Sequence, residues 1–408
     1  MKHLTALAPL LLLACGVPTA GSTQAPEGEI AAPSAETSAV ALGNRAFAID
    51  LYRNLAATPG NVFISPISLA GAFGPLTAGA QGDTRQAIGK VLRFPPSDAD
   101  LHPQLGGLLR ALESNRKGAR VSIANALWVA ENFPVKPAFL DVGKRHYGAE
   151  IANLDFRNGA AAAGRINQWV ERETNKRIRE LVKPDALGPS TRLVVTNAVH
   201  FLGDWAVAFE PRMTRPQTFY AAAGERQVPL MFASRRIRYA EADGVQMIDL
   251  PYKGDRLSMS VILPKQRGGL GAVEAALSDA QLGRWLEQLD AAGPREVQVH
   301  LPKVEIESSY ELVDPLTALG MGVAFDPARA NLRGIADADL FISKVVQKTF
   351  LRVDEKGTEA AAATAIIVVE TSAPADPPPT FRADHPFLLL IRDKPTGGVL
   401  FLGRIAAP

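Results

Sequence analysis

Six histidines are the residues best suited to general acid–base catalysis, but none stands in a pattern that an enzyme needs. The chain has no Gly-x-Ser-x-Gly element to place a serine nucleophile, and no His-x-x-x-His or cysteine pair to bind zinc. It also lacks a phosphate-binding glycine loop and a dinucleotide fingerprint. We therefore expect a protein that is not an enzyme and needs neither a metal nor a cofactor. The histidines, which we interpret as structural or surface residues, are His3, His102, His146, His200, His300 and His385.

The segment 340–381 has a composition that a packed domain rarely shows. A strand-like run, 341–353, is followed by small residues at 358–365, and four prolines precede residue 381. Read as a strand, the even-numbered positions from 358 to Val368 share one face, which is small at first and apolar further on. Such a strand could slide between two existing strands and gain hydrogen bonds on both edges. Composition alone favours the alternative, an alanine-rich helix followed by a buried strand.

Residues 353–365 resemble the hinge signature of the serpin family, and residues 381–388 with 400–404 resemble its C-terminal signature. Each of these matches would be weak alone. Taken together and in order, they identify the chain from about residue 40 onward as resembling a serpin. Further segments that resemble serpin elements lie at 61–69, 196–205, 301–303 and 310–321.

The resemblance implies an α+β serpin fold with three β-sheets, eight or nine helices and an exposed reactive-centre loop at about 355–381. Serpins have a metastable native state, whose stability is a rate rather than an equilibrium. A protease attacks the loop and forms an acyl-enzyme, and the cut loop then inserts as a new central strand of the largest sheet. The resemblance thus implies a monomeric suicide-substrate inhibitor that forms a covalent complex with a target serine protease.

The composition of the hinge bears on whether the chain inhibits. Insertion must bury Thr358, Ala360 and Ala362, and a charge or a proline at these positions would oppose it. Neither is present, so we favour an inhibitor. The alternative is a non-inhibitory protein on the same fold, with a binding or structural role. The hinge residues are Glu355, Gly357, Thr358, Glu359, Ala360, Ala361, Ala362, Ala363 and Thr364.

The family's spacing implies the position of the scissile bond. Counted sixteen residues on from Glu355, this bond lies between Thr371 and Ser372, whereas the count back from Phe387 places it near Ala375. The loop is therefore four residues longer than is usual in the family. We place the scissile bond by the count from Glu355, because the length of the inserted strand sets how far the protease travels.

On this register the residues before the cut are small or aliphatic, apart from one glutamate. They suit the pockets of elastase-like or subtilisin-like serine endopeptidases rather than a trypsin-like pocket, and cysteine proteases are a further class of target. Cleavage after Glu370 by a glutamate-selective protease is the alternative. The specificity residues are Val368, Val369 and Glu370.

The resemblance also assigns residues to the opening of the main sheet. Gln347 stands where family members commonly have a histidine, and it faces the equivalents of Ser65, Ser68 and Asn197; we call these four residues the shutter. Glutamine both donates and accepts hydrogen bonds, so we expect this latch to persist with an altered pH dependence. Trp205 matches the aromatic residue at the upper opening, the breach, and a role in core packing is compatible with that position.

The elements that must position these residues are predicted to form one mixed α+β domain. No linker rich in proline and glycine divides residues 40–360, and several strands are uninterrupted apolar runs, typical of a sheet covered on both faces. Helices dominate the first half of the chain and strands the second. Helices are predicted at 40–57, 66–80, 84–92, 101–115, 137–146, 163–181, 270–290 and 311–319, and strands at 61–64, 120–129, 151–155, 192–201, 227–232, 236–240, 245–251, 257–263, 296–306, 340–353, 386–392 and 398–405.

The charge balance excludes some partners. The chain has 408 residues, a formal net charge of +2 and a hydrophobic fraction of 47%, which is ordinary for a globular protein. No basic block stands out, so we expect no nucleic acid as partner. The short run at 116–120 is interpreted as a solvated helix end.

The N-terminus predicts export. Residues 1–14 combine a charged start with an apolar stretch too short to span a bilayer, as in a secretory signal peptide. The sequence up to Cys15 resembles a bacterial lipobox, which implies that this single cysteine carries acyl chains that bind the lipid bilayer. Residues 15–39 are predicted to be a flexible tether before a serpin domain at 40–408. We expect an extracytoplasmic protein that is anchored to the cell envelope, at the outer membrane or cell surface, with a plain secreted form as the alternative.

Overall fold

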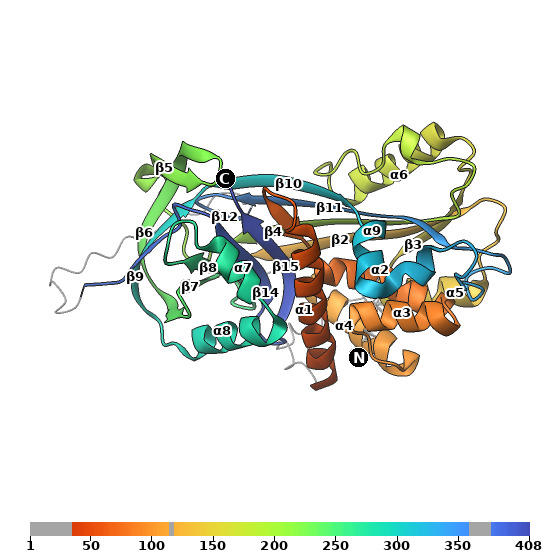
Figure 1. Ribbon diagram of the computed structural model, residues 1–408, viewed down its shortest axis with the longest axis horizontal. Helices are drawn as coiled ribbons and strands as arrows, with labels where there is room; N and C mark the ends of the chain where they lie inside the picture. The colour runs from red at the N-terminus through yellow and green to blue at the C-terminus, as the bar shows by residue number, and fades with distance from the viewer. Residues whose placement is uncertain (1–34, 114–117, 359–376) are drawn as a thin grey trace, which may run out of the picture. The chain divides into compact units, whose positions relative to one another are not determined.

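The computed structural model describes residues 35–113, 118–358 and 377–408. These residues form an α+β fold with helices concentrated in the first half of the chain and strands in the second, as predicted (Figure 1). The α-helices are α1 (Ala35–Leu55), α2 (Pro66–Gly79), α3 (Gly82–Leu92), α4 (Asp98–Glu113), α5 (Pro137–Val142), α6 (Gly159–Glu173), α7 (Leu270–Ala276), α8 (Asp279–Ala291) and α9 (Val313–Leu316). Short 3₁₀ or π-helical turns are η1 (Gly143–Tyr147), η2 (Pro184–Ala186), η3 (Pro211–Met213), η4 (Thr317–Met321) and η5 (Gly322–Phe325).

One sheet has six strands in the order β10-β11-β12-β4-β2-β3. Strands β11 and β4 run parallel and pair from Ile342 opposite Leu193 to Phe350 opposite His200. Beyond the end of this pairing, the two-residue strand β12 lies between them. The strands are β10 (Val304–Glu311), β11 (Ile342–Val353), β12 (Gly357–Thr358), β4 (Leu193–Asp204), β2 (Ala119–Ala130) and β3 (Glu150–Leu154).

The other strands follow the order β1-β15-β14-β8-β7-β6-β9-β13, with β5 added on β6. The long strand β6 pairs with β5 and β9 through residues 224–237 and with β7 through residues 238–242, so it joins two sheets. Together with the six-stranded sheet, these account for the three sheets of the predicted fold. The strands are β1 (Val62–Ile64), β15 (Gly398–Ile405), β14 (Phe387–Asp393), β8 (Leu257–Pro264), β7 (Val245–Pro251), β6 (Gly224–Ala242), β9 (Arg295–Pro302), β13 (Thr380–Arg382) and β5 (Arg215–Ala221).

Both faces of the six-stranded sheet are covered, which explains its uninterrupted apolar runs. Helix α6 lies over one face of the sheet (Figure 1). Its Trp169 packs edge-on against Trp128 of β2 with ring centroids 5.5 Å apart. Ala198 of β4 and Val346 of β11 belong to the same buried cluster, so α6 and its neighbouring residues lie across both strands of the parallel pair. On the opposite face lies α2, which is buried at nearly every residue.

Several boundaries differ from the predictions. The helix predicted at 270–290 is two helices, because Leu277 is extended and the Ser278 side chain caps α8 by accepting a hydrogen bond from the Gln281 N–H. Helix α6 ends at Glu173 rather than at residue 181. It ends there because the next residues include Asn175 and Lys176, whose left-handed backbone angles cannot continue a helix.

The strand predictions failed where strands are short or half exposed. The range 296–306 covers most of β9 and only the first three residues of β10, and the ranges 227–232 and 236–240 are both parts of β6. Strand β5 was not predicted, since most of its residues are partly exposed and show no apolar alternation.

Helix α1 begins earlier than predicted, at Ala35. Within the described residues, no helix has an apolar stretch long enough to cross a membrane.

Candidate functional site

The hinge begins as a strand inside the six-stranded sheet. Thr358 pairs with Val353 of β11 on one side and with Gly203 of β4 on the other, and Gly357 pairs with Asp204. A Cβ atom at Gly357 would overlap the carbonyl oxygen of Gly203, so this close approach of two backbones requires glycine. The sheet therefore already holds the first two residues of an additional strand between β11 and β4.

The side chain of Thr358 is buried and has a polar partner. Its Oγ1 lies 2.7 Å from the Oη of Tyr252, and both residues are 0% exposed. Burial raises the pKa of the Tyr252 hydroxyl, which therefore stays protonated and can donate. The Tyr252 ring stacks on the Trp205 ring with centroids 4.7 Å apart. Thr358 thus occupies a buried position in which its hydroxyl has a hydrogen-bond partner.

The turn that precedes β12 is held by the segment that follows β4. The backbone N–H of Trp205 donates to the Lys356 carbonyl at 2.9 Å, and its indole Nε1 donates to the Asp354 carbonyl at 3.0 Å. The backbone N–H of Phe209 donates to the Glu355 carbonyl at 2.7 Å. We call these three hydrogen bonds the hinge clamp. Trp205, which the sequence assigned to the breach, lies just after the end of β4 against this turn and is a core residue at 1% exposed.

The carboxylate of Glu355 is bound beside the clamp. It accepts hydrogen bonds from Lys303 Nζ at 2.9 Å and from Thr214 Oγ1 at 2.8 Å. Burial acts to raise the pKa of Glu355, but these hydrogen bonds and the charge of Lys303 outweigh burial and lower it overall. The carboxylate is therefore ionised at neutral pH. It joins the hinge to Lys303, which precedes β10, and to Thr214, which follows η3.

The four shutter residues lie together in the core, as predicted. Gln347 Nε2 donates to the Ser65 carbonyl at 2.9 Å and to Asn197 Oδ1 at 2.6 Å, while its Oε1 accepts from the Ser65 N–H at 3.2 Å. Asn197 donates in turn to the hydroxyl of Ser68. All four residues are 0% exposed. Glutamine thus supplies both the donor and the acceptor that this position needs.

One member of this network was missed by sequence reasoning. Asn125 of β2 accepts from Asn197 Nδ2 at 2.5 Å and donates to the Ser68 carbonyl at 3.2 Å, and it is buried. The signal that could have found it is a lone amide side chain in an otherwise apolar strand, because a buried amide needs partners.

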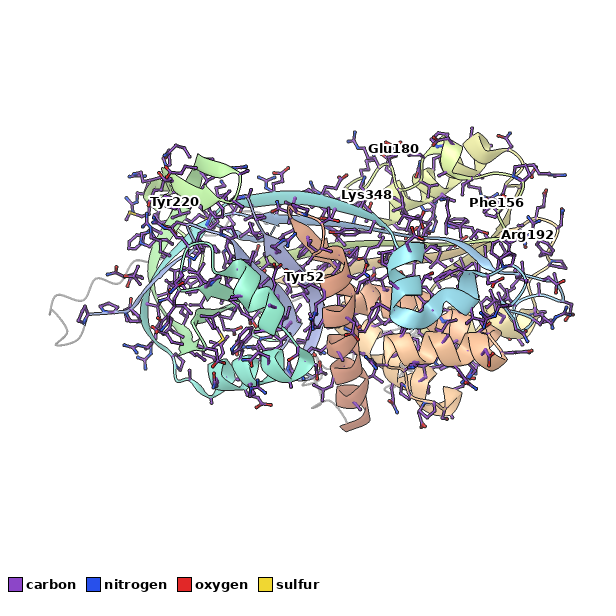
Figure 2. All side chains as sticks on the ribbon, viewed as in Figure 1. Tyr52, Phe156, Glu180, Arg192, Tyr220 and Lys348 are labelled. Atoms are coloured by element: carbon purple, nitrogen blue, oxygen red, sulfur yellow. The ribbon has the colours of Figure 1, made fainter. Side chains whose placement is uncertain are left out.

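Below β12, the parallel pairing closes the seam between β11 and β4. Gln347 lies directly opposite Asn197 in this pairing, so the shutter spans the seam. One residue further along, Lys348 Nζ donates to the Glu180 carbonyl at 2.7 Å and forms an ion pair of 2.7 Å with Glu307 (Figure 2). A new strand in this seam would therefore have to part the shutter and shift the segment that follows α6.

The C-terminal end of the predicted loop joins a different sheet. Residues Thr380 and Arg382 of β13 pair in parallel with Gln298 and His300 of β9. The chain between β12 and β13 therefore connects two sheets. The remaining hinge residues, Glu359 to Thr364, lie outside the described residues, as do Val368 to Ser372, which contain the predicted scissile bond, and Cys15.

The described histidines have structural partners. His385 is buried, with Nδ1 2.8 Å from Asp384 Oδ1 and Nε2 2.7 Å from the Pro264 carbonyl oxygen. His102 Nδ1 lies 2.7 Å from the Tyr147 hydroxyl. With both ring nitrogens engaged, His385 cannot activate a nucleophile.

Comparisons with known proteins give the same class of fold. The family described as serpin (serine protease inhibitor) matches residues 42–408. An uncharacterised serpin-like protein of Thermococcus kodakarensis is 39% identical over 89% of this chain and 84% of its own length. The leukocyte elastase inhibitor of Sus scrofa is 37% identical over 90% of this chain and 98% of its own. Human thyroxine-binding globulin bound to thyroxine superposes with a TM-score of 0.82 at 29% identity, covering 92% of this chain and 100% of the globulin.

The two sheets joined by β6, the six-stranded sheet and the start of a strand between β11 and β4 define the class of fold. The chain belongs to the serpin family. This family includes protease inhibitors and non-inhibitory members.

Proposed function

We propose that this serpin is an inhibitor that traps serine endopeptidases covalently. The observation that carries the proposal is the position of Thr358, which lies buried between β11 and β4 with hydrogen-bonding strands on both sides. An inhibitor of this kind needs a sheet that accepts the cut loop as a strand. A hinge whose residues Gly357 and Thr358 already occupy that place supports the inhibitory role over a purely binding or structural one.

The proposed chemistry belongs to the target protease. Its serine Oγ attacks the carbonyl carbon of Thr371, the peptide nitrogen of Ser372 leaves with a proton, and an ester joins Thr371 to the protease. Insertion of the cut loop beside β4 then moves the protease before water can hydrolyse the ester. The residues of this chain supply the cleavable bond and the free energy of insertion.

The proposed targets are elastase-like or subtilisin-like endopeptidases, with cysteine proteases as a further class. The aliphatic residues Val368 and Val369 support this choice, because small apolar pockets accept such residues. The printed name of the porcine relative, leukocyte elastase inhibitor, supports it as well.

We further propose that the protein acts outside the cytoplasm as a monomer held at the cell envelope by acyl chains on Cys15. The support is the lipobox-like sequence that ends at Cys15. Expression of Cys15→Ser in a host that processes lipoproteins should move the protein from the detergent phase to the aqueous phase. Equal partition of the two forms would overturn the anchor.

Incubation with pancreatic elastase and with subtilisin tests the proposal. An inhibitor forms a band on denaturing gels at the summed mass of the two proteins, and protease activity falls in proportion. Clean cleavage by every protease tried, with no such band, would favour the non-inhibitory alternative.

A further inference from the structure

Arg235 is a buried cation without an anion. Its side chain points from β6 into the core, where the residue lies opposite Val297 of β9 and is only 8% exposed. Within the described residues, its Nε and Nη2 atoms have no hydrogen-bond partner. Burying a charge without a partner costs several kcal/mol, so such a group is rarely kept without a use.

The other buried arginines of the described chain show how unusual this is. Arg256 binds Asp393, Arg392 binds two aspartates, and Arg404 binds Glu274. Among the residues that the structure describes, the one partner recorded for the Arg235 guanidinium is the ring of Phe209, whose centroid lies 3.6 Å from the guanidinium carbon. A cation over an aromatic face gains some stability, but it leaves the N–H groups at the guanidinium edge unsatisfied.

The unsatisfied edge has the geometry that carboxylates occupy elsewhere in this chain. Arg45 uses its Nε and Nη2 to bind the two oxygens of Asp279 at 2.7 and 3.2 Å, and Arg256 uses the same pair on Asp393. Two parallel N–H groups match the two oxygens of a carboxylate. Burial alone lowers the pKa of Arg235 to about 9, so the guanidinium remains charged at neutral pH and keeps these donors.

We propose that Arg235 is the core of a binding site for a small carboxylate anion, which seats its two oxygens on Nε and Nη2. The residue is only 8% exposed and its Nε and Nη2 atoms are enclosed, so an anion that reaches them must be small. Selectivity for carboxylate over chloride follows from the paired donors.

The site is coupled to the hinge through Phe209. Phe209, whose ring stacks on Arg235, donates its backbone N–H to the Glu355 carbonyl. The centroids of the Phe209 and Trp205 rings lie 6.4 Å apart. A carboxylate that fixes the guanidinium also fixes Phe209, and thereby the hinge clamp. Binding itself is independent of inhibition, and only its effect on loop insertion rests on the proposed function.

Sodium acetate is the probe, compared with sodium chloride at equal ionic strength. In the full chain, acetate should raise the thermal midpoint by about 2 °C with saturable dependence, and ¹³C-acetate should show line broadening on addition of the protein. In Arg235→Met both effects should vanish. The matched control is Arg236→Met, which removes the adjacent exposed cation and should respond like the unaltered protein.

An equal response to chloride, or an acetate response retained in Arg235→Met, would overturn the site. If that variant fails to fold, Arg235→Lys keeps the charge but loses the paired donors, and it should bind acetate at least tenfold more weakly. Absence of ¹³C-acetate broadening with the unaltered protein would also overturn the site. Acetate binding by a protein that inhibits no protease would leave the site standing and remove only the proposed function.

Discussion

The hydroxyl oxygens of Thr358 and Tyr252 lie 2.7 Å apart, and both side chains are completely buried. This contact joins Thr358, in the hinge strand β12, to Tyr252, which follows β7 of another sheet. Breaking this contact would lower the stability of the fold, because a buried hydroxyl without a partner can bind neither water nor another protein group. The hinge is thus fixed at one end before any protease arrives.

Tyr252→Phe should lower native stability by about 1–3 kcal/mol, since it leaves the Thr358 hydroxyl unsatisfied. The rate of unfolding in urea measures this effect in a kinetically trapped fold. The double variant Tyr252→Phe with Thr358→Val serves as control and should recover part of the loss. Additive losses in the double variant would show that the two hydroxyls do not interact.

Thr358→Arg should convert the protein from an inhibitor into a substrate. The position has no room or partner for a charge, so the hinge cannot stay between β11 and β4 and the cut loop inserts too slowly. The measurement is the ratio of covalent complex to cleaved protein on a denaturing gel, with Thr358→Ser as the control that keeps the hydroxyl. Unchanged complex formation in Thr358→Arg would contradict insertion at this site.

The ion pair between Glu355 and Lys303 should make native stability fall below a certain acidic pH. We call this pH the acid limit. Because the pKa of Glu355 is lowered in the folded protein, its contribution to stability is fully present above the ordinary value of 4.5 and is lost as the pH falls through the lowered pKa. In Lys303→Met burial dominates, the pKa rises, and the acid limit should move to higher pH.

Unfolding rates between pH 3 and 6 test this expectation. Lys344→Met is the matched control, because it removes another partly exposed lysine–glutamate pair, with Glu311, whose carboxylate is more exposed than that of Glu355 and lies away from the hinge. The same acid limit in Lys303→Met and in the unaltered protein would show that Glu355 does not control it.

The shutter should depend on the amide of Gln347. Gln347→Leu keeps a similar volume but leaves the Ser65 N–H, the Ser65 carbonyl and Asn197 Oδ1 without this partner. We expect a loss of about 2–4 kcal/mol, measured by unfolding rates, and faster insertion of a synthetic loop peptide. The exposed Gln227→Leu is the control. A Gln347→Leu variant as stable as this control would rule out a latch at the shutter.

The sequence predicted the shutter better than it predicted the hinge clamp. Gln347, Ser65 and Asn197 lie in segments whose order and spacing resemble one family, so their meeting could be predicted. Phe209 lies in none of these segments, and Lys303, which lies in the segment 301–303, is not paired with Glu355 by any pattern in the sequence. They act through a backbone N–H and a long flexible side chain, whose partners are set by tertiary packing rather than by a local pattern.

Burial also explains which parts of the fold were predictable. Strands β4 and β8 are buried on both faces and stand out as apolar runs, whereas the half-exposed β5 does not. The break at Ser278 was missed because the residues on both sides are good helix formers, and only the capping hydrogen bond separates the helices. The unsatisfied Arg235 could not be predicted, since a basic residue in a strand is usually solvated.

The most direct test of the account is mass spectrometry of the complex formed with elastase or subtilisin. We predict an ester between the protease serine and the carbonyl carbon of Thr371, together with a released C-terminal fragment that begins at Ser372. An ester one residue earlier, at Glu370, would move the scissile bond but keep the mechanism. Cleaved protein with no ester-linked peptide, from both proteases, would contradict covalent trapping.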